Sequence, residues 1–209
     1  MVISNLTWLI IFSFMYVIAL SFLYFSKTRL DNGENKIYKY ILITNLVGLV
    51  LQFLCDYVSY KYDVISPVIS DFILRIYLVY FIIFISLLIF YLIEILFKHK
   101  KIANIITLIV DILISIVVFL LPYNLHRDVE QKIYYTYGPA VQIIFYLSGI
   151  LSLVIFVILI SKRKSVGLNK KVLPIWIYLL LGLGVMVIQM KYPELVITTA
   201  MESLICCLM

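Results

Sequence analysis

Carboxyl groups inside long apolar runs are the first candidates for chemistry in this chain. Asp111 lies about eight residues, or roughly 12 Å, into an apolar run at 103–121. No Lys or Arg lies three or four positions from it, and Glu202 lies at a comparable depth in a run at 195–209. An isolated carboxylate is costly in hydrocarbon, so we expect each to be protonated or paired with a polar group on another helix. Both are candidates for interhelical hydrogen bonding or for a signalling or proton-linked role.

Three more polar side chains share a single apolar run. Asn45, Gln52 and Asp56 all lie within 40–59. Amide side chains carry both donors and acceptors, so they can hydrogen-bond between helices. Asn45 would lie at a depth similar to that of Asp111, and we predict it as a candidate partner for that carboxyl group.

Two other carboxyl groups have a local explanation. Asp71 precedes Arg75 by four residues, and Glu94 precedes Lys98 by four. Residues four apart are neighbours on one helix face, so opposite charges at this spacing can pair. Both pairs lie near the ends of an apolar run at 70–96, where long basic side chains can reach the membrane surface. We therefore interpret them as structural ion pairs.

The residue types needed for common enzymatic or metal chemistry are missing from the apolar runs. Both histidines, His99 and His126, fall between runs, which excludes an embedded HExxH metal site or Ser–His pair. The cysteines Cys55, Cys206 and Cys207 show no metal-ligand spacing. No Gly-rich phosphate loop is present. We predict no catalytic residue, no metal and no cofactor, and hence a chain that is not itself an enzyme.

The elements that must position these side chains are membrane-spanning helices. Hydrophobic residues make up 65% of the 209 residues, against roughly 45–50% in soluble domains. A helix needs about 20 apolar residues to cross about 30 Å of hydrocarbon. We predict one all-α, polytopic transmembrane domain over 1–209, in contact with the lipid bilayer. Six full helices are expected, followed by a truncated seventh, at 6–25, 40–59, 70–96, 103–121, 139–161, 172–190 and 195–209.

The placement of basic residues predicts the orientation of these helices. Of 17 Lys and Arg, 12 lie in the connections after the first, third and fifth runs. Connections rich in Lys and Arg stay on the cytoplasmic side, so we predict that the N-terminus lies outside the cell membrane and that the seventh run heads inward. The net charge of +6 then reflects topology, and no nucleic-acid partner is expected.

Five segments form an ordered set along the chain. They are Glu-Asn-Lys-Ile-Tyr at 34–38, Cys-Asp-Tyr-Val-Ser-Tyr at 55–60, Tyr-Thr-Tyr-Gly-Pro-Ala-Val at 135–141, Lys-Lys-Val-Leu-Pro-Ile at 170–175, and Pro-Glu-Leu-Val-Ile-Thr-Thr-Ala-Met-Glu at 193–202. In order and helix placement they resemble the N-terminal multi-helix membrane sensor region of bacterial two-component histidine kinases of Firmicutes type. The resemblance extends through essentially the whole chain.

This resemblance implies an input module that senses a stimulus at or in the membrane and shifts its seventh helix. In such kinases a dimerisation domain with the phosphoacceptor His and an ATP-binding domain follow that helix. We therefore expect a chain cut off from its own kinase domains, with those domains or a homodimer as partners by family analogy. No catalytic or ligand-binding residue of the family carries over to a position in this sequence.

Two functions remain open. A sensor is favoured by the odd number of helices and by the outer connection at 122–138, which mixes both charge signs with aromatic residues and could recognise an unknown peptide or small ligand. The alternative is a small multi-pass transporter with a midplane polar site. Its site would draw on embedded polar residues, although the two halves of the chain show no evident similarity. These residues are Asp56, Asp111, Gln52 and Glu202.

Overall fold

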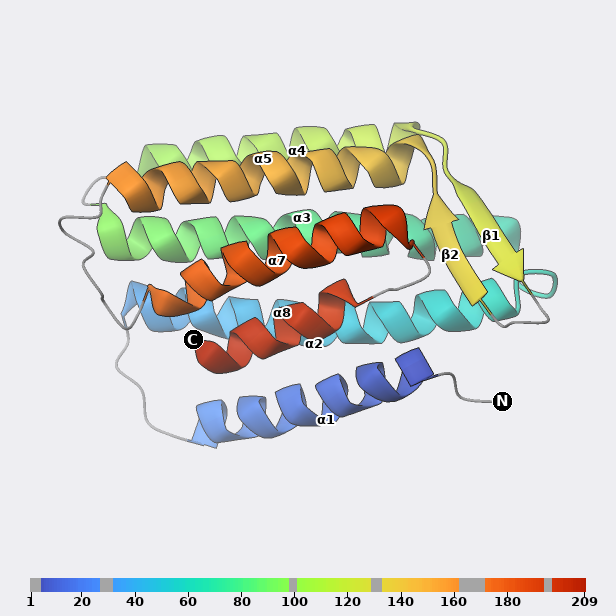
Figure 1. Cartoon of the computed structure of the whole chain (residues 1–209), viewed down its shortest axis with the longest axis horizontal. Coiled ribbons are helices and arrows are strands. Elements are labelled where there is room, and N and C mark those ends of the chain that lie inside the picture. Colours follow the sequence, from blue (N-terminus) through green and yellow to red (C-terminus); the bar gives the residue numbers. More distant parts are fainter. Residues whose placement is uncertain (1–4, 27–31, 98–100, 129–132, 162–171, 194–196) are drawn as a thin grey trace.

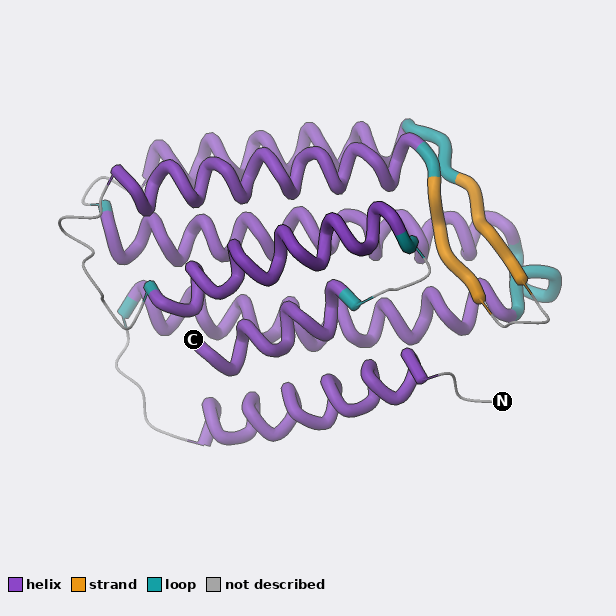
Figure 2. Tube along the Cα trace, in the orientation of Figure 1, coloured by secondary structure: helices purple, strands orange, loops and turns teal. Residues whose placement is uncertain are grey.

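The described part of the chain is a bundle of long helices lying side by side, with a small β-hairpin at one end (Figures 1 and 2). The structure is a computed structural model that describes residues 5–26, 32–97, 101–128, 133–161, 172–193 and 197–209. Six helices in these ranges are long and apolar enough to cross a membrane. The predicted all-α, polytopic class is thereby confirmed, and the chain is a multi-pass membrane protein.

The helix boundaries follow the apolar runs closely, with one extension. The helices are α1 (Asn5–Ser26), α2 (Gly33–Tyr60), α3 (Pro67–Leu96), α4 (Lys101–Leu120), α5 (Pro139–Ser161), α7 (Leu173–Lys191) and α8 (Thr198–Leu208). Helix α2 begins well before residue 40, because its first turns carry charged residues that lower hydropathy without opposing a helix. The side chain of Asn32 caps this start by accepting a hydrogen bond of 2.9 Å from the Asn35 amide.

Helix α3 is the central element of the bundle. About 67% of its apolar window is buried inside the protein, against 6% for α4. It packs against α2, α4 and α5, while α8 packs against α1, α2 and α7. The fully buried side chains of Phe84, Leu88 and Leu92 on α3 belong to the main hydrophobic core. Side chains of α3 can therefore reach several other helices.

The connection between α4 and α5 contains regular structure that the sequence analysis did not predict. Strands β1 (Asn124–Asp128) and β2 (Ile133–Tyr137) pair antiparallel, with Asn124 opposite Tyr137. Gly138 follows with a φ of 111°, which is accessible to glycine and rare for other residues. This conformation lets the chain turn directly from β2 into α5.

The two ends of the bundle differ in the connections they carry. The last residues of α1, α3 and α5 and the first residues of α2, α4 and α7 lie at the end opposite the hairpin (Figure 1). These residues flank the three Lys- and Arg-rich connections of the sequence. All three connections therefore start and finish at one end, as the predicted topology requires. Which end faces the cytoplasm stays a prediction.

Candidate functional site

Helix α8 buries a row of polar residues along one face. Thr199, Glu202, Ser203 and Cys206 are each no more than 2% exposed. Spacings of three and four residues place them on the same side of the helix. We call these four residues the polar row of α8. In a membrane, a buried polar face of this kind indicates contact with other helices, because lipid offers no hydrogen bonds.

Helix α3 supplies hydrogen bonds to the first half of the row. The hydroxyl of Tyr80 donates to Oε2 of Glu202 at 2.5 Å, and the hydroxyls of Tyr77 and Thr199 lie 3.0 Å apart. The two tyrosine rings are nearly parallel, with centroids 6.2 Å apart. Glu202 thus has a neutral hydroxyl group as its hydrogen-bond partner.

Helix α2 supplies partners to the second half. The hydroxyl of Ser203 donates to Oδ1 of Asn45 at 3.0 Å, and the Tyr38 hydroxyl donates to the backbone carbonyl of Cys206 at 2.7 Å. Every turn of the row therefore contacts either α2 or α3 through a hydrogen bond. These bonds fix the rotation of α8 about its own axis.

A glycine on α2 makes room for the central contact. A Cβ atom placed on Gly48 would collide with the ring and the hydroxyl of Tyr80. The absence of a side chain at Gly48 therefore lets the Tyr80 ring pack closely against α2 while its hydroxyl reaches Glu202. Any larger residue at this position would have to displace Tyr80.

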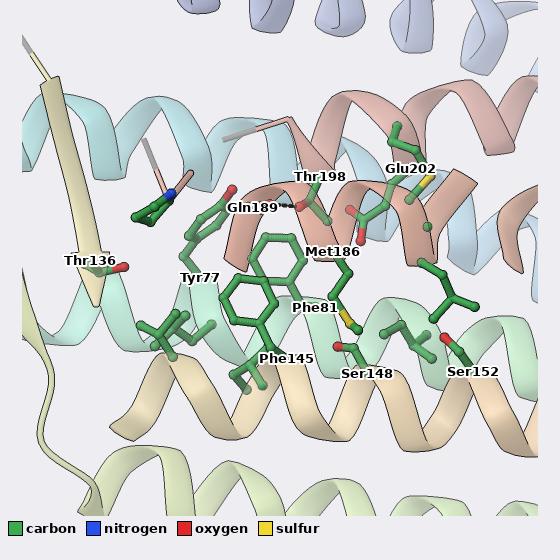
Figure 3. A pocket seen from close by; sticks show the side chains of 18 of the residues that line it. Tyr77, Phe81, Thr136, Phe145, Ser148, Ser152, Met186, Gln189, Thr198 and Glu202 are labelled. Carbon is green, nitrogen blue, oxygen red and sulfur yellow. Dashed lines mark hydrogen bonds between the residues drawn. The ribbon is translucent and has the colours of Figure 1, made fainter. Parts of the chain in front are cut away.

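A cavity adjoins the polar row between α3, α5, α7 and α8 (Figure 3). Its volume is about 110 Å³, and β2 contributes Tyr135 and Thr136 at one end. The Thr198 hydroxyl donates to the side-chain carbonyl of Gln189 on its wall. Glu202 is the only carboxyl group among the described residues that line this cavity, and no Lys, Arg or His is among them.

Asp111 lies elsewhere in the bundle, and the partner predicted for it is wrong. Its Oδ1 accepts a hydrogen bond of 2.7 Å from the hydroxyl of Ser86 on α3. Helix α4 packs against α3 and α5, with α3 lying between α4 and α2. Asn45 on α2 therefore pairs with Ser203 instead. A similar predicted depth in the membrane therefore did not make Asn45 the partner of Asp111.

Gln52 and Asp56 do not line the cavity. Gln52 is 1% exposed and Asp56 is half-buried, both on α2. Of the four residues predicted for a midplane transport site, only Glu202 lines the cavity. The structure thus does not bring Asp56, Gln52, Asp111 and Glu202 together at one site.

The ion pair predicted at the start of α3 forms, and Arg75 does more than its spacing indicates. Nε of Arg75 lies 2.9 and 3.0 Å from the two carboxylate oxygens of Asp71. Its Nη1 donates to the backbone carbonyls of Val118 and Leu121 at 2.6 and 2.8 Å. Arg75 thereby satisfies carbonyl groups left without helical partners at the end of α4.

The pair predicted between Glu94 and Lys98 is not visible in the structure. Glu94 lies in the last turn of α3, whereas Lys98 lies outside the described residues. This pair therefore stays a prediction.

A second ion pair joins the hairpin to the connection between α2 and α3. Nη1 and Nη2 of Arg127 each donate to one carboxylate oxygen of Asp63 at 2.8 Å. These hydrogen bonds lower the pKa of Asp63 below its ordinary value of 3.8. The Asp63 side chain is 77% exposed, so water screens the pair and its contribution to stability is small.

Several partners in these contacts were missed at the level of sequence. Tyr77, Tyr80 and Ser86 carry hydroxyl groups, whereas the predicted intramembrane polar residues carry carboxyl and amide groups. A signal for the two tyrosines was present, since both lie well inside α3 and far from the membrane interfaces where tyrosine usually gathers. Their hydroxyl groups need partners inside the bundle.

Comparisons with known proteins identify no family for this chain. No protein-family model, curated protein or solved structure matches the chain. Within the described residues, no group of three or more His, Cys, Asp or Glu side chains could hold a metal ion. The site is therefore interpreted from its own geometry.

Proposed function

We propose that this chain is a membrane-embedded signal-input module whose moving element is α8. The polar row is the observation that carries the proposal. Hydrogen bonds between helices in membranes contribute only about 0.6 kcal/mol on average, so each contact of the row can be exchanged at modest cost. A short helix attached through such contacts is well suited to change position when a stimulus acts on the bundle.

The cavity supplies a place for that stimulus to act. Glu202 belongs to both the polar row and the cavity wall, and Thr198 at the start of α8 lines the same space. A ligand there, or a change in the bilayer, would shift α8 only if it favoured one position over another. On this proposal the output is a histidine kinase in the cell membrane, acting as a homodimer, as the sequence resemblance implies.

The proposal is tested in the parent protein, with whatever coding sequence follows Met209 included. We expect a kinase domain there and autophosphorylation from ATP in nanodiscs. Tyr80→Phe should change the basal rate between about threefold and about eighteenfold, since one interhelical hydrogen bond is worth about 0.6 to 1.7 kcal/mol. Ser86→Ala is the matched control, because it removes a hydrogen bond to Asp111 and leaves the polar row intact.

Two results would count against this function. One is a basal rate and stimulus response that are unchanged by Tyr80→Phe and by a second substitution in the row, Ser203→Ala. The other is a coding sequence beyond Met209 that specifies no kinase or other output domain.

A small transporter is the second candidate, and the cavity with its single carboxyl group is the feature that favours it. Proteoliposomes that accumulate a radiolabelled mixture of amines and amino acids, and lose this uptake with Glu202→Gln, would support transport. Uptake equal to that of empty liposomes would argue for the signal-input module.

A further inference from the structure

The walls of the cavity between α3, α5, α7 and α8 are mainly aromatic and aliphatic. Tyr77, Phe81 and Phe145 present their rings on the side of α3 and α5, and Met186 lies opposite on α7 (Figure 3). Aromatic faces attract cations as well as apolar groups, because the ring face carries negative charge. The walls therefore fit an apolar molecule and also tolerate a positive charge.

Among the described residues that line the cavity, the only charge that a side chain can readily carry is negative. Glu202 can carry a negative charge, and the remaining polar lining residues are neutral, with no cationic side chain among the described ones. Its hydrogen-bond donor, the Tyr80 hydroxyl, is also neutral. An ionised Glu202 would need an opposite charge nearby, because a lone carboxylate is costly at this depth. A ligand can supply that charge.

Size limits the ligand further. A dry cavity of about 150 Å³ can accommodate benzene, which has six non-hydrogen atoms, so a cavity of 110 Å³ suits a molecule of about four to five non-hydrogen atoms. Thr136 of β2 lies at the hairpin end of the cavity, while Ser152 lies toward the other end (Figure 3).

We propose that this cavity binds a small primary amine with a compact aliphatic body, its ammonium group paired with Glu202 and its body lying against Tyr77 and Phe81. A ligand in this position contacts α8 directly at the polar row. The inference rests on the proposed function in taking the cavity as its input site. Binding can nevertheless be measured without any downstream domain.

The test uses the full chain in nanodiscs with isobutylamine as the probe. Isobutanol, which has the same aliphatic body and no charge, is the matched compound, and empty nanodiscs correct for partition into lipid. We expect equilibrium dialysis to show isobutylamine binding at least tenfold more tightly than isobutanol. Glu202→Gln should abolish this difference, whereas Asp111→Asn, which changes a carboxyl group outside the cavity, should preserve it.

A second pair of variants keeps the test informative if Glu202→Gln fails to fold. A Cβ at Gly182 would lie 3.4 Å from Met201 and 3.5 Å from Tyr178, inside the cavity lining, while a Cβ at Gly184 meets nothing within 4 Å. Gly182→Ala should weaken isobutylamine binding severalfold, and Gly184→Ala should leave it unchanged. Both changes raise helix propensity equally, so the difference reports the cavity.

The outcomes separate this inference from the proposed function. Equal binding of the two compounds, binding of neither, or an amine preference that survives Glu202→Gln would each overturn the ligand class. Kinase output that still responds to substitutions in the polar row would then leave the signal-input function standing. Conversely, specific amine binding without any effect on output would support the ligand site and reject the cavity as the input site of the signal.

Discussion

Helices α4 and α8 each carry one carboxyl group in an apolar stretch, yet they lie in opposite environments. Only Val118 of the 20 residues in α4 is buried, whereas six of the 11 residues in α8 are buried. Helix α4 is the longer and more apolar of the two, with a mean hydropathy of 2.7 over its window. Hydropathy thus predicts that a helix lies in the membrane, but its depth within the bundle depends on where its polar groups find partners.

The two carboxyl groups show the same contrast at the level of single side chains. Asp111 lies in a groove of about 650 Å³ between α3 and α4, half-buried and bonded to Ser86. Glu202 is 2% exposed and enclosed by α3, α7 and α8. A peripheral helix can be anchored by a few polar contacts while lipid covers its apolar face. An enclosed polar face depends on protein partners alone.

The largest effect is expected for Arg75, whose side chain holds the end of α4 against α3. Arg75→Met removes the donor to the Val118 and Leu121 carbonyls and the partner of Asp71. Because hydrogen bonds to charged groups are worth about 1.5–3 kcal/mol each, we expect the free energy of unfolding to fall by about 2–4 kcal/mol. Unfolding by SDS in mixed micelles, followed by circular dichroism, measures this change.

Lys191→Met serves as the control for Arg75→Met, because Lys191 is exposed at the end of α7. Its substitution should change the unfolding free energy little. A loss below about 0.5 kcal/mol for Arg75→Met, which is the low end for a single hydrogen bond, would mean that lipid and apolar contacts suffice to hold α4.

Gly48→Ala should give the next largest effect, now on the side of α8. The added methyl group collides with Tyr80, and overpacking of this kind typically costs about 1–3 kcal/mol. The same unfolding assay measures it, with Gly184→Ala as a control that has open space around its Cβ. Equal stability of the two variants would show that Tyr80 has room to move without loss, and that the contact with Glu202 does not constrain the bundle.

Single hydroxyl deletions compare the two carboxyl groups directly. Tyr80→Phe and Ser86→Ala each remove one hydrogen bond, with expected losses of about 0.6 kcal/mol and at most about 1.7 kcal/mol. We expect the larger loss for Tyr80→Phe, because Glu202 is enclosed and Asp111 is half-buried. A double-mutant cycle with Glu202→Gln isolates the interaction energy. A larger loss for Ser86→Ala would reverse the comparison.

The smallest effect is expected for the solvent-exposed ion pair between Asp63 and Arg127. The pKa of Asp63 is lowered in the folded protein by Arg127, so the pair stabilises the fold above the ordinary pKa near 3.8. This contribution should be lost as pH falls through the lower, folded pKa. Thermal unfolding between pH 6 and pH 3 should therefore show a slightly steeper loss of stability in the wild-type chain than in Asp63→Asn. Parallel curves would indicate that the pair contributes nothing.

How far the sequence could predict this molecule depends on the kind of contact. Apolar runs located six helices because each is set by its own residues, and the i,i+4 spacing located the pair of Asp71 and Arg75. The partner of Asp111 was wrong because depth along a helix does not say which helices are neighbours. The hairpin was missed because its strands are only five residues long and because β2 is rich in the tyrosine that also marks membrane interfaces.

The spacing of the polar row has a consequence for how α8 can respond. A turn of one residue rotates a helix by about 100°, which would bring Ala200 to the position of Thr199 and Leu204 to that of Ser203. All the hydrogen bonds of the row belong to one rigid helix, so such a rotation breaks them together. At intermediate angles the helix loses these hydrogen bonds without forming equivalent ones. A stimulus acting on α8 would therefore change the fraction of molecules in each rotational position of the helix. The strength of the stimulus would determine that fraction and not the angle of the helix.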